Sequence, residues 1–354
     1  MKHFKILSSS SSSSSFFLLA AFCLLLSACA PASPKTITIL THDSFFISEE
    51  VIRIFETDNN VKVSFIQSGD AGSMLNQAIL TKDAPIADIL FGVDNTFLSR
   101  ALDADIFEVY ASPALSDSAD EFKLDPSNRA LPVDYGDVCI NYDKAYFAEN
   151  NLAVPQSFED LAKAEYKGLL AVENPATSSP GLAFLLATRA HFGDGYLDYW
   201  KSLKENGVVV VDGWETAYYT NFSASSGKGP QPMVVSYASS PAAEVFFASP
   251  APSESPTASI VASGMCFRQI EFVGILKNTP NKILAQKFMD FMLSQKFQED
   301  MPLNMFVYPV NNNAELPKVF TIFAQVAKEP AALSAAEIAS NRDAWIEAWT
   351  AAMK

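Results

Sequence analysis

Residue types that bind organic cations recur at the ends of predicted strands in this sequence. A carboxylate, Asp94, directly follows a nearly continuous apolar run at residues 87–93. Trp214 comes shortly after a strand-like run at residues 207–211, and Tyr237 ends another such run. Aromatic faces attract cations, and a carboxylate balances the positive charge. The pattern therefore favours a site for a flat organic cation.

Each of these residues also has a structural alternative. Asp94 suits the cap of a segment that starts at Thr96, because aspartate accepts bonds from free backbone N–H groups. Ser178 and Ser179 precede a predicted helix at residues 181–192. Hydroxyl and N–H groups at such a position either bind an anion or only cap the helix. A single aromatic residue serves packing more often than it binds a ligand.

Signals of enzyme chemistry are weak or absent. The sequence has no Gly-x-Ser-x-Gly, no His-Glu-x-x-His and no phosphate-binding loop. Beyond the N-terminal segment only His42 and His191 could serve histidine-based acid–base chemistry. We therefore expect a binding protein that is not an enzyme and needs no cofactor or bound metal.

The N-terminal segment has the pattern of an export signal. Lys2 and Lys5 precede an apolar run at residues 16–26, which is about half the roughly 20 residues that span a bilayer. Leu-Ser-Ala-Cys then ends at Cys29, which resembles a bacterial lipoprotein signal at residues 1–28. In that case Cys29 becomes the lipidated first residue, and an ordinary signal peptide is the alternative.

Length and charge restrict the class of protein further. The 354 residues exceed the usual size of one core even without the signal, so two lobes are expected. The net charge of −15 argues against nucleic acid, whose phosphates need a basic surface. The acidic balance is compatible with a cationic ligand.

The predicted elements alternate between strands and helices. Apolar or alternating runs predict strands at residues 36–40, 61–66, 87–93, 138–142, 169–172, 207–211, 233–237 and 267–276. Helical stretches are predicted at residues 49–57, 73–81, 157–164, 181–192, 281–291 and 335–353. A Pro-rich surface loop is predicted at residues 247–259. This order indicates an α/β fold, whose ligands bind at the carboxyl ends of the strands.

Two cysteines follow Cys29. Cys139 and Cys266 both lie in strand-like runs, and an exported chain reaches an oxidising compartment. We predict that they form a disulfide, with two buried free thiols as the alternative.

Together these segments resemble the thiamine-binding proteins of bacterial ABC thiamine importers, which are two-lobed solute-binding proteins. The resemblance extends from about residue 36 to residue 353. It rests on colinear blocks at residues 41–45, 87–95, 132–136, 177–182, 213–218, 236–242, 308–310 and 342–349. It implies a type II periplasmic binding protein-like fold, in which two α/β lobes with central mixed sheets are joined by a hinge of crossing strands.

The resemblance also implies a domain division and a mechanism. We expect a tether at residues 29–35, lobe 1 at residues 36–134 plus 268–310, lobe 2 at residues 135–267, and C-terminal helices at residues 311–354 that pack on the lobes. The hinge would lie near residues 134–136 and 268–269, and closure would trap thiamine or its mono- or diphosphate. The closed monomer, anchored outside the cytoplasm by lipid on Cys29, would deliver the ligand to the permease and its ATPase subunit.

The ligand-binding positions of the family carry over in type at four residues. Its acidic residue facing the thiazolium falls on Asp94, its serine near the alcohol or phosphate end on Ser178, and its cleft Trp and Tyr on Trp214 and Tyr237. The full set of candidate ligand-binding residues is Asp94, Ser178, Ser179, Trp214, Tyr218, Tyr237, His42 and Phe306.

Three positions depart from the family pattern. An early Tyr is His42 here, a late Trp is Phe306, and a second Tyr after the Ser-Pro segment is Ala243. His42 and Phe306 can still stack on a ring, whereas Ala243 cannot. The compartment for the pyrimidine or the phosphate end of the ligand therefore stays open. The exact ligand and its phosphorylation state stay open as well, with a related pyrimidine or another thiazolium compound as alternatives to thiamine.

Two other functions remain open from the sequence. The pair Tyr218 and Tyr219 suits ferric iron, because ferric-binding proteins of this superfamily use paired tyrosinates as hard oxygen ligands. A thiaminase-like enzyme would need a cysteine nucleophile beside an acidic base, and Cys139 is the candidate near the hinge.

Overall fold

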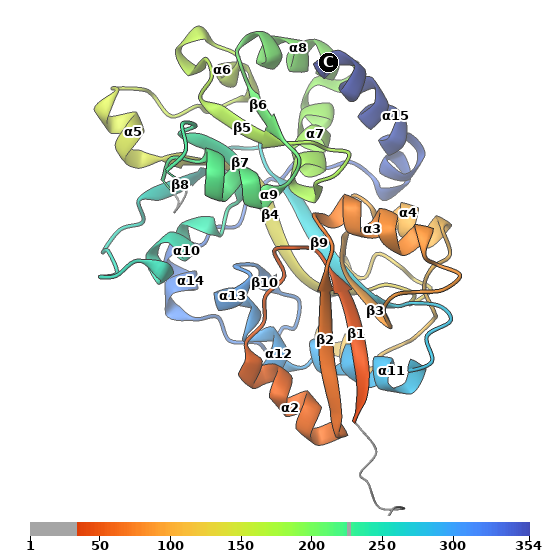
Figure 1. Ribbon diagram of the computed structural model, residues 1–354. Helices are drawn as coiled ribbons and strands as arrows, with labels where there is room; N and C mark the ends of the chain where they lie inside the picture. Colours follow the sequence, from red (N-terminus) through yellow and green to blue (C-terminus); the bar gives the residue numbers. More distant parts are fainter. Residues whose placement is uncertain (1–33, 225–227) are drawn as a thin grey trace, which may run out of the picture. The chain divides into compact units, whose positions relative to one another are not determined.

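The computed structural model describes residues 34–224 and 228–354 (Figure 1). The predicted signal and the lipidation site Cys29 lie outside the described residues. Within the described ranges, no helix is both long and apolar enough to cross a membrane.

A mixed β-sheet runs through the described part of the chain. Its strands have the order β2-β1-β3-β9-β4-β7-β5-β6, and β8 and β10 both pair with β4. The strands are β1 (Lys35–Thr41), β2 (Val61–Gln67), β3 (Ile89–Asp94), β4 (Leu131–Asp143), β5 (Leu170–Glu173), β6 (Val209–Val211), β7 (Met233–Tyr237), β8 (Thr257–Ile260), β9 (Phe267–Ile275) and β10 (Tyr308–Pro309). β1 and β3 are parallel, as are β7, β5 and β6, whereas β9 and β4 are antiparallel to their neighbours.

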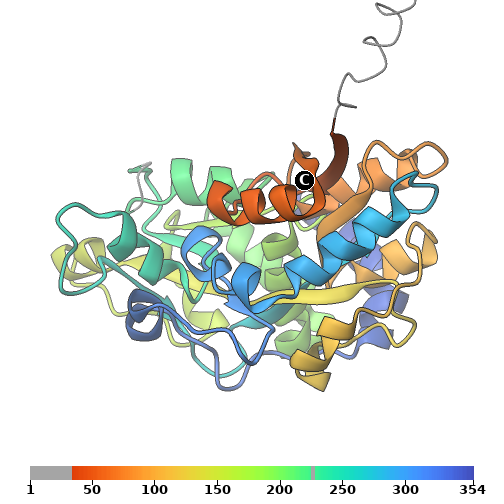
Figure 2. The ribbon, with the colours of Figure 1, turned by 90° about the horizontal axis from the view of Figure 1, so that it is seen from below.

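Helices cover both parts of this sheet. They are α2 (Glu49–Asn59), α3 (Ala71–Leu80), α4 (Leu98–Asp103), α5 (Lys144–Glu149), α6 (Phe158–Leu161), α7 (Ser179–Phe192), α8 (Tyr196–Glu205), α9 (Trp214–Thr216), α10 (Ser240–Phe247), α11 (Lys282–Met292), α12 (Gln295–Gln298), α13 (Met301–Asn304), α14 (Lys318–Phe323) and α15 (Ala335–Met353). α2 and α11 lie side by side (Figure 2), where the rings of Phe55 and Phe288 meet edge to face at 4.9 Å.

Two long strands connect the two parts of the sheet. β4 pairs with β9 over its first half and continues to pair with β7 and β8 over its second half (Figure 1). In this crossing, Asp134 lies opposite Glu271 and Gly136 lies opposite Gln269. The two predicted hinge segments are therefore paired with each other.

The terminal helix α15 packs on both parts of the fold. Trp349 meets Trp200 of α8 edge to face at 5.4 Å. Near the middle of α15, Arg342 donates to the hydroxyl of Ser99 in α4 and covers the ring of Phe97. The helix thus connects an element of the α7–α8 region to an element that follows β3.

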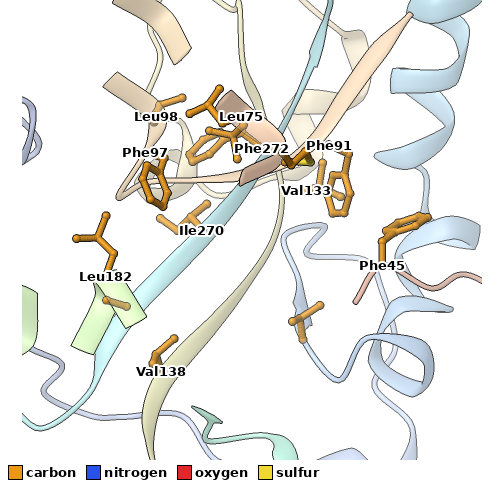
Figure 3. Packing of buried hydrophobic residues seen from close by; sticks show 14 of the residues in the cluster. Phe45, Leu75, Phe91, Phe97, Leu98, Val133, Val138, Leu182, Ile270 and Phe272 are labelled. Atoms are coloured by element: carbon orange, nitrogen blue, oxygen red, sulfur yellow. The ribbon is translucent and has the colours of Figure 1, made fainter. Parts of the chain in front are cut away.

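A hydrophobic core surrounds β3 and β9 (Figure 3). All residues of β3 are buried, and Phe91 packs in the same cluster as Phe272 of β9 and Leu75 of α3. Fully burying one such side chain contributes about 1.5–3 kcal/mol. This core fixes the carboxyl end of β3, where Asp94 lies.

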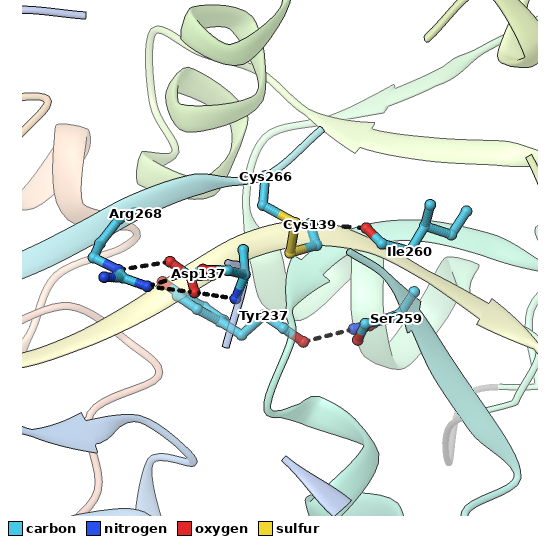
Figure 4. The surroundings of a disulfide bond; sticks show 9 residues. Asp137, Cys139, Tyr237, Ser259, Ile260, Cys266 and Arg268 are labelled. Atoms are coloured by element: carbon cyan, nitrogen blue, oxygen red, sulfur yellow. Dashed lines mark hydrogen bonds and ion pairs between the residues drawn. A yellow bond between two sulfur atoms is a disulfide. The ribbon is translucent and has the colours of Figure 1, made fainter. Parts of the chain in front are cut away.

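The predicted disulfide is confirmed. Cys139 of β4 is bonded to Cys266, directly before β9 (Figure 4). Next to it, Arg268 donates to Asp137 at 2.9 Å, which adds an ion pair between the same two strands. The thiaminase-like alternative is wrong on this point, because Cys139 has no free thiol.

Most of the predicted elements are present, but β4 is much longer than the run predicted at 138–142. Pro132, Asp134 and Gly136 suggest a loop by composition. The strand tolerates them because its register shifts between Pro132 and Asp134 and because neighbouring strands bury it. α8 and α10 were not predicted, and β8 begins inside the segment predicted as a surface loop.

Candidate functional site

A cavity of about 310 Å³ lies at the ends of strands from both parts of the sheet. Its size is at the lower end of the roughly 300–1,000 Å³ typical of small-molecule sites. It is lined by His42, Ser44, Asp70, Ala71, Ser179, Pro180, Trp214, Tyr218, Tyr219, Tyr237, Ser240, Ala243, Glu244, Phe247, Glu271, Asn304, Met305, Phe306 and Val307. Six of the eight candidate residues from the sequence therefore meet at one cavity.

His42 is the first residue after β1, and its side chain lines the cavity. Its Nε2 atom lies 3.4 Å from a carboxylate oxygen of Glu271 in β9. Burial lowers the pKa of His42, but Glu271, together with Asp70 and Asp43, outweighs this effect and leaves the pKa raised. Glu271 in turn faces Asp134 of β4, whose pKa is raised well above its usual value by burial and by the charge of Glu271.

Two glycines make room for the site. Gly92 interrupts the pairing of β3 with β9 at φ +100°, and a side chain there would collide with the ring of His42. Gly136 in β4 lies under the ring of Tyr237, where an added Cβ would stand 2.8 Å from a ring carbon. The backbone of two strands thus sets the positions of two cavity side chains.

Asp70 joins segments from both sides of the cavity. It is the N-cap of α3 and accepts from its neighbour Ala71 at 2.7 Å. Its other partners are the N–H groups of Trp214 at 3.1 Å and Ser179 at 3.4 Å, more than a hundred residues away. Burial raises the pKa of Asp70, while bonds from the Ser178 hydroxyl and from backbone N–H groups oppose the rise.

Three aromatic rings form one wall. Trp214 stacks on Tyr218 at 5.0 Å with 19° between the ring planes, and Tyr237 meets Trp214 edge to face at 6.4 Å. The indole N–H of Trp214 donates to Ser236 at 2.8 Å, which fixes the orientation of the ring. Flat faces held in this way can receive a flat ligand.

Gln269 of β9 connects the wall to residues behind it. Its side-chain oxygen accepts from the Tyr237 hydroxyl at 2.9 Å. Its amide donates to the Ser179 hydroxyl at 2.5 Å and to Asp94. One glutamine therefore holds three of the candidate residues in place.

Asp94 and Ser178 lie behind the cavity wall rather than in it. One oxygen of Asp94 accepts from the hydroxyl of Thr96 at 2.7 Å and from two backbone N–H groups, and the other accepts from Gln269. Asp94 therefore caps the turn after β3, as the structural alternative predicted, and it is fully buried. Ser178, equally buried, caps α7 by accepting from Gly181 at 3.4 Å.

Phe306 also lines the cavity. Its backbone has φ +55°, and its carbonyl accepts from the hydroxyl of Ser239. The ring meets that of Phe247 at 5.5 Å. Nearby, Glu244 accepts from the Tyr218 hydroxyl at 2.7 Å, and burial raises the pKa of this glutamate.

The sequence analysis did not identify the cavity carboxylates Asp70, Glu244 and Glu271. Asp70 carried a usable signal, because an aspartate after Gly69 and before a helical run indicates an N-cap at a chain turn. Glu271 also carried one, since it is a lone acidic residue among apolar residues of a predicted strand. Glu244 had none, because α10 itself was not predicted.

Comparisons with known proteins agree with this architecture. The family description "Bacterial extracellular solute-binding protein" matches residues 84–321. The thiamine-binding periplasmic protein of Salmonella typhimurium is 30% identical, over 93% of this chain and 97% of that protein. A solved structure of a periplasmic thiamin binding protein is 27% identical, with a TM-score of 0.79 over 92% of this chain and 98% of that one. A ferric binding protein from Campylobacter jejuni is 20% identical, with a TM-score of 0.72 over 89% and 99%, and shares the fold.

Proposed function

This chain belongs to the bacterial extracellular solute-binding protein family, and from that premise we propose that it captures thiamine or a thiamine phosphate for an ABC importer. Members of this family bind solutes without making or breaking bonds. The type II-like fold of the chain is shared with solved solute-binding proteins. The identity of the solute and the residues that bind it are the proposal.

One observation carries the proposal: aromatic faces and carboxylates share one small cavity. Trp214, Tyr237 and Phe306 line it together with Asp70 and Glu271. Thiamine consists of two flat heterocycles, one of which is a permanent cation. Each cation–π contact would contribute about 0.5–2 kcal/mol, and a buried carboxylate would balance the charge.

We propose Asp70 as the carboxylate nearest the cation. It lines the cavity, whereas Asp94 is separated from it by Gln269 and Ser179. The sequence assigned this role to Asp94, and that assignment requires Gln269 to move when the ligand binds. His42, Ser179 and the four aromatic candidates would complete the contacts.

Closure of the cavity would occur about the crossing strands. With residues 36–134 and 268–310 in one lobe and residues 135–267 in the other, Asp70 and its partners Ser179 and Trp214 lie on different lobes. The backbone bond from Gly72 to Thr177, at 3.1 Å, crosses the same boundary. Opening would break these bonds, and a cation bound between the lobes would favour the closed state.

Calorimetric titration of the chain from Ala30 onward with thiamine tests the proposal. We expect one-to-one binding that Trp214→Ala weakens, because this change removes the stacked face. Phe46→Ala is the control, since Phe46 is 59% exposed and outside the cavity. Absence of binding to thiamine and to both of its phosphates would refute the proposal.

Ferric iron is the second candidate, favoured by Tyr218 and Tyr219 in the cavity wall. Two observations weigh against it. Burial raises the pKa of both tyrosines, which opposes the tyrosinate forms that ferric iron needs. Tyr218 is also stacked on Trp214 and donates to Glu244. A visible charge-transfer band on addition of ferric iron would favour this candidate.

We also propose that Cys29 carries a lipid that anchors the protein outside the cytoplasmic membrane, where the permease and its ATPase subunit would receive the solute. The support is the signal pattern of residues 1–28 and the family's extracellular role. Metabolic labelling with a radioactive fatty acid should label the native chain but not Cys29→Ala. Equal labelling of both would exclude this site.

A further inference from the structure

The N-terminus of α7 lines the cavity, and its first backbone N–H group already donates to the carboxylate of Asp70. α7 has 14 residues, and the N–H groups of its first turn are where a phosphate would bind to such a helix. Asp70 accepts from Ser179 N–H at 3.4 Å, at the first position of α7, and from Trp214 N–H at 3.1 Å. The carboxylate of Asp70 therefore takes up the backbone N–H groups that a phosphate ester would need as hydrogen-bond donors.

Further negative groups line the rest of the cavity. Glu271 lies in the middle of β9 and is 8% exposed. Glu244 accepts from the Tyr218 hydroxyl in the same lining. Among the lining residues that the structure describes, His42 is the basic side chain, and its Nε2 is 3.4 Å from Glu271. The charge of a protonated His42 is therefore already matched by a carboxylate.

We propose that this cavity selects the unphosphorylated thiamine cation and rejects its phosphate esters, an inference that rests on the function proposed above. A phosphate monoester carries about −1.5 to −2 charges at pH 7. It would have to enter beside Asp70, Glu244 and Glu271, and like charges in a partly desolvated site repel one another strongly. Rejection by a built-in repulsive group is a recognised source of specificity.

One position that departs from the family pattern, Ala243, also favours thiamine over its phosphates. Ala243 lines the cavity where the family has a tyrosine, so that position offers no hydroxyl to a phosphate. The adjacent residue in the chain, Glu244, places a carboxylate in the same lining. This region of the cavity thus presents negative charge in place of donors.

Titrations with thiamine, thiamine monophosphate and thiamine diphosphate test the inference on the full mature chain. We expect thiamine to bind one-to-one and the monophosphate to bind roughly 100-fold more weakly. Affinities for thiamine and the monophosphate within about threefold of each other, or a preference for the monophosphate, would overturn the inference and leave the proposed function standing. No binding of any of the three would overturn both.

Variants identify the source of the selection. Glu244→Gln removes one charge and keeps the size of the side chain, so the ratio of the thiamine and monophosphate affinities should narrow by about tenfold. Glu254→Gln is the matched control, because Glu254 is on the surface, paired with Lys144, and outside the cavity. An unchanged ratio in Glu244→Gln and in Asp70→Asn would show that these carboxylates do not cause the selection.

Discussion

Asp70 is the residue whose charge and position make it the strongest determinant of cation affinity. Asp70→Asn should weaken thiamine binding by about 1.5–3 kcal/mol, because it removes a partly buried charge that would lie next to the cation. The fold should survive, since asparagine is as good an N-cap for α3 as aspartate.

Calorimetric titration measures this loss. Asp120→Asn is the matched control, because it changes the net charge equally at an exposed aspartate. Asp94→Asn should have a smaller effect, since Asp94 is behind the wall. A larger loss in Asp94→Asn than in Asp70→Asn would instead restore the assignment made from sequence.

Asp94 should make stability depend on pH. Burial raises its pKa to about 6, although Ser179 and Thr96 oppose the rise. A carboxyl group with a raised folded pKa contributes stability that is complete below the unfolded value of about 3.9 and is lost as the pH rises through about 6. Asp94→Asn cannot ionise and should lose this dependence.

The unfolding free energy of the wild type, relative to that of Asp94→Asn, should therefore fall by up to about 3 kcal/mol between about pH 4 and pH 7. Urea unfolding across this range measures the difference. Asp120→Asn should show no such fall, because Lys123 lowers the pKa of Asp120. A constant difference for Asp94→Asn would show that folding does not raise the pKa of Asp94.

At the scale of elements, β4 helps to position the aromatic wall because Gly136 has no side chain and leaves room for the ring of Tyr237. Gly136→Ala should push the ring of Tyr237, because the new Cβ would stand 2.8 Å from it, and so break the bond from Tyr237 to Gln269. We expect a stability loss of about 1–3 kcal/mol and a loss of thiamine affinity of about tenfold. Thermal unfolding and calorimetric titration measure the two effects.

Gly195→Ala is the control for this prediction. Gly195 precedes α8 with an ordinary negative φ, and an added Cβ there would meet nothing within 4 Å. It should therefore bind thiamine normally. Normal binding by Gly136→Ala as well would show that Tyr237 does not need its present position.

Elements with strong local patterns could be predicted from the sequence, and those that depend on partners could not. The apolar run of β3 and the helix α7 were predicted because composition alone indicates them. β4 was predicted only in part, since Pro132 and Gly136 suit a strand here only because β9 and Tyr237 lie against them. The same holds for the site residues. Trp214 and Tyr237 could be predicted because they are aromatic residues at the ends of predicted strands. Asp70 could not, because its role comes from contacts with N–H groups that are distant in the sequence.

At the scale of the whole molecule, the connection between the two parts of the sheet is narrow. β4 and β9 cross between them, and the disulfide joins β4 to the residue before β9. Cys139 and Cys266 are 127 residues apart, and the segment between them holds β5, β6, β7 and α7. The bond thus closes the chain around nearly all of the proposed second lobe.

Removing this disulfide should destabilise the protein without changing the cavity. A long closed loop restricts the unfolded chain, and for cysteines 127 residues apart the loop-entropy model gives about 5 kcal/mol as an upper limit. The double variant Cys139→Ala with Cys266→Ala should lose about 2–5 kcal/mol of unfolding free energy in urea. Neither cysteine lines the cavity, so thiamine affinity of the folded variant should match that of the wild type. If affinity fell with stability, the disulfide would also be setting the relative position of β4 and β9, and with it the geometry of Tyr237 and Gln269 at the crossing.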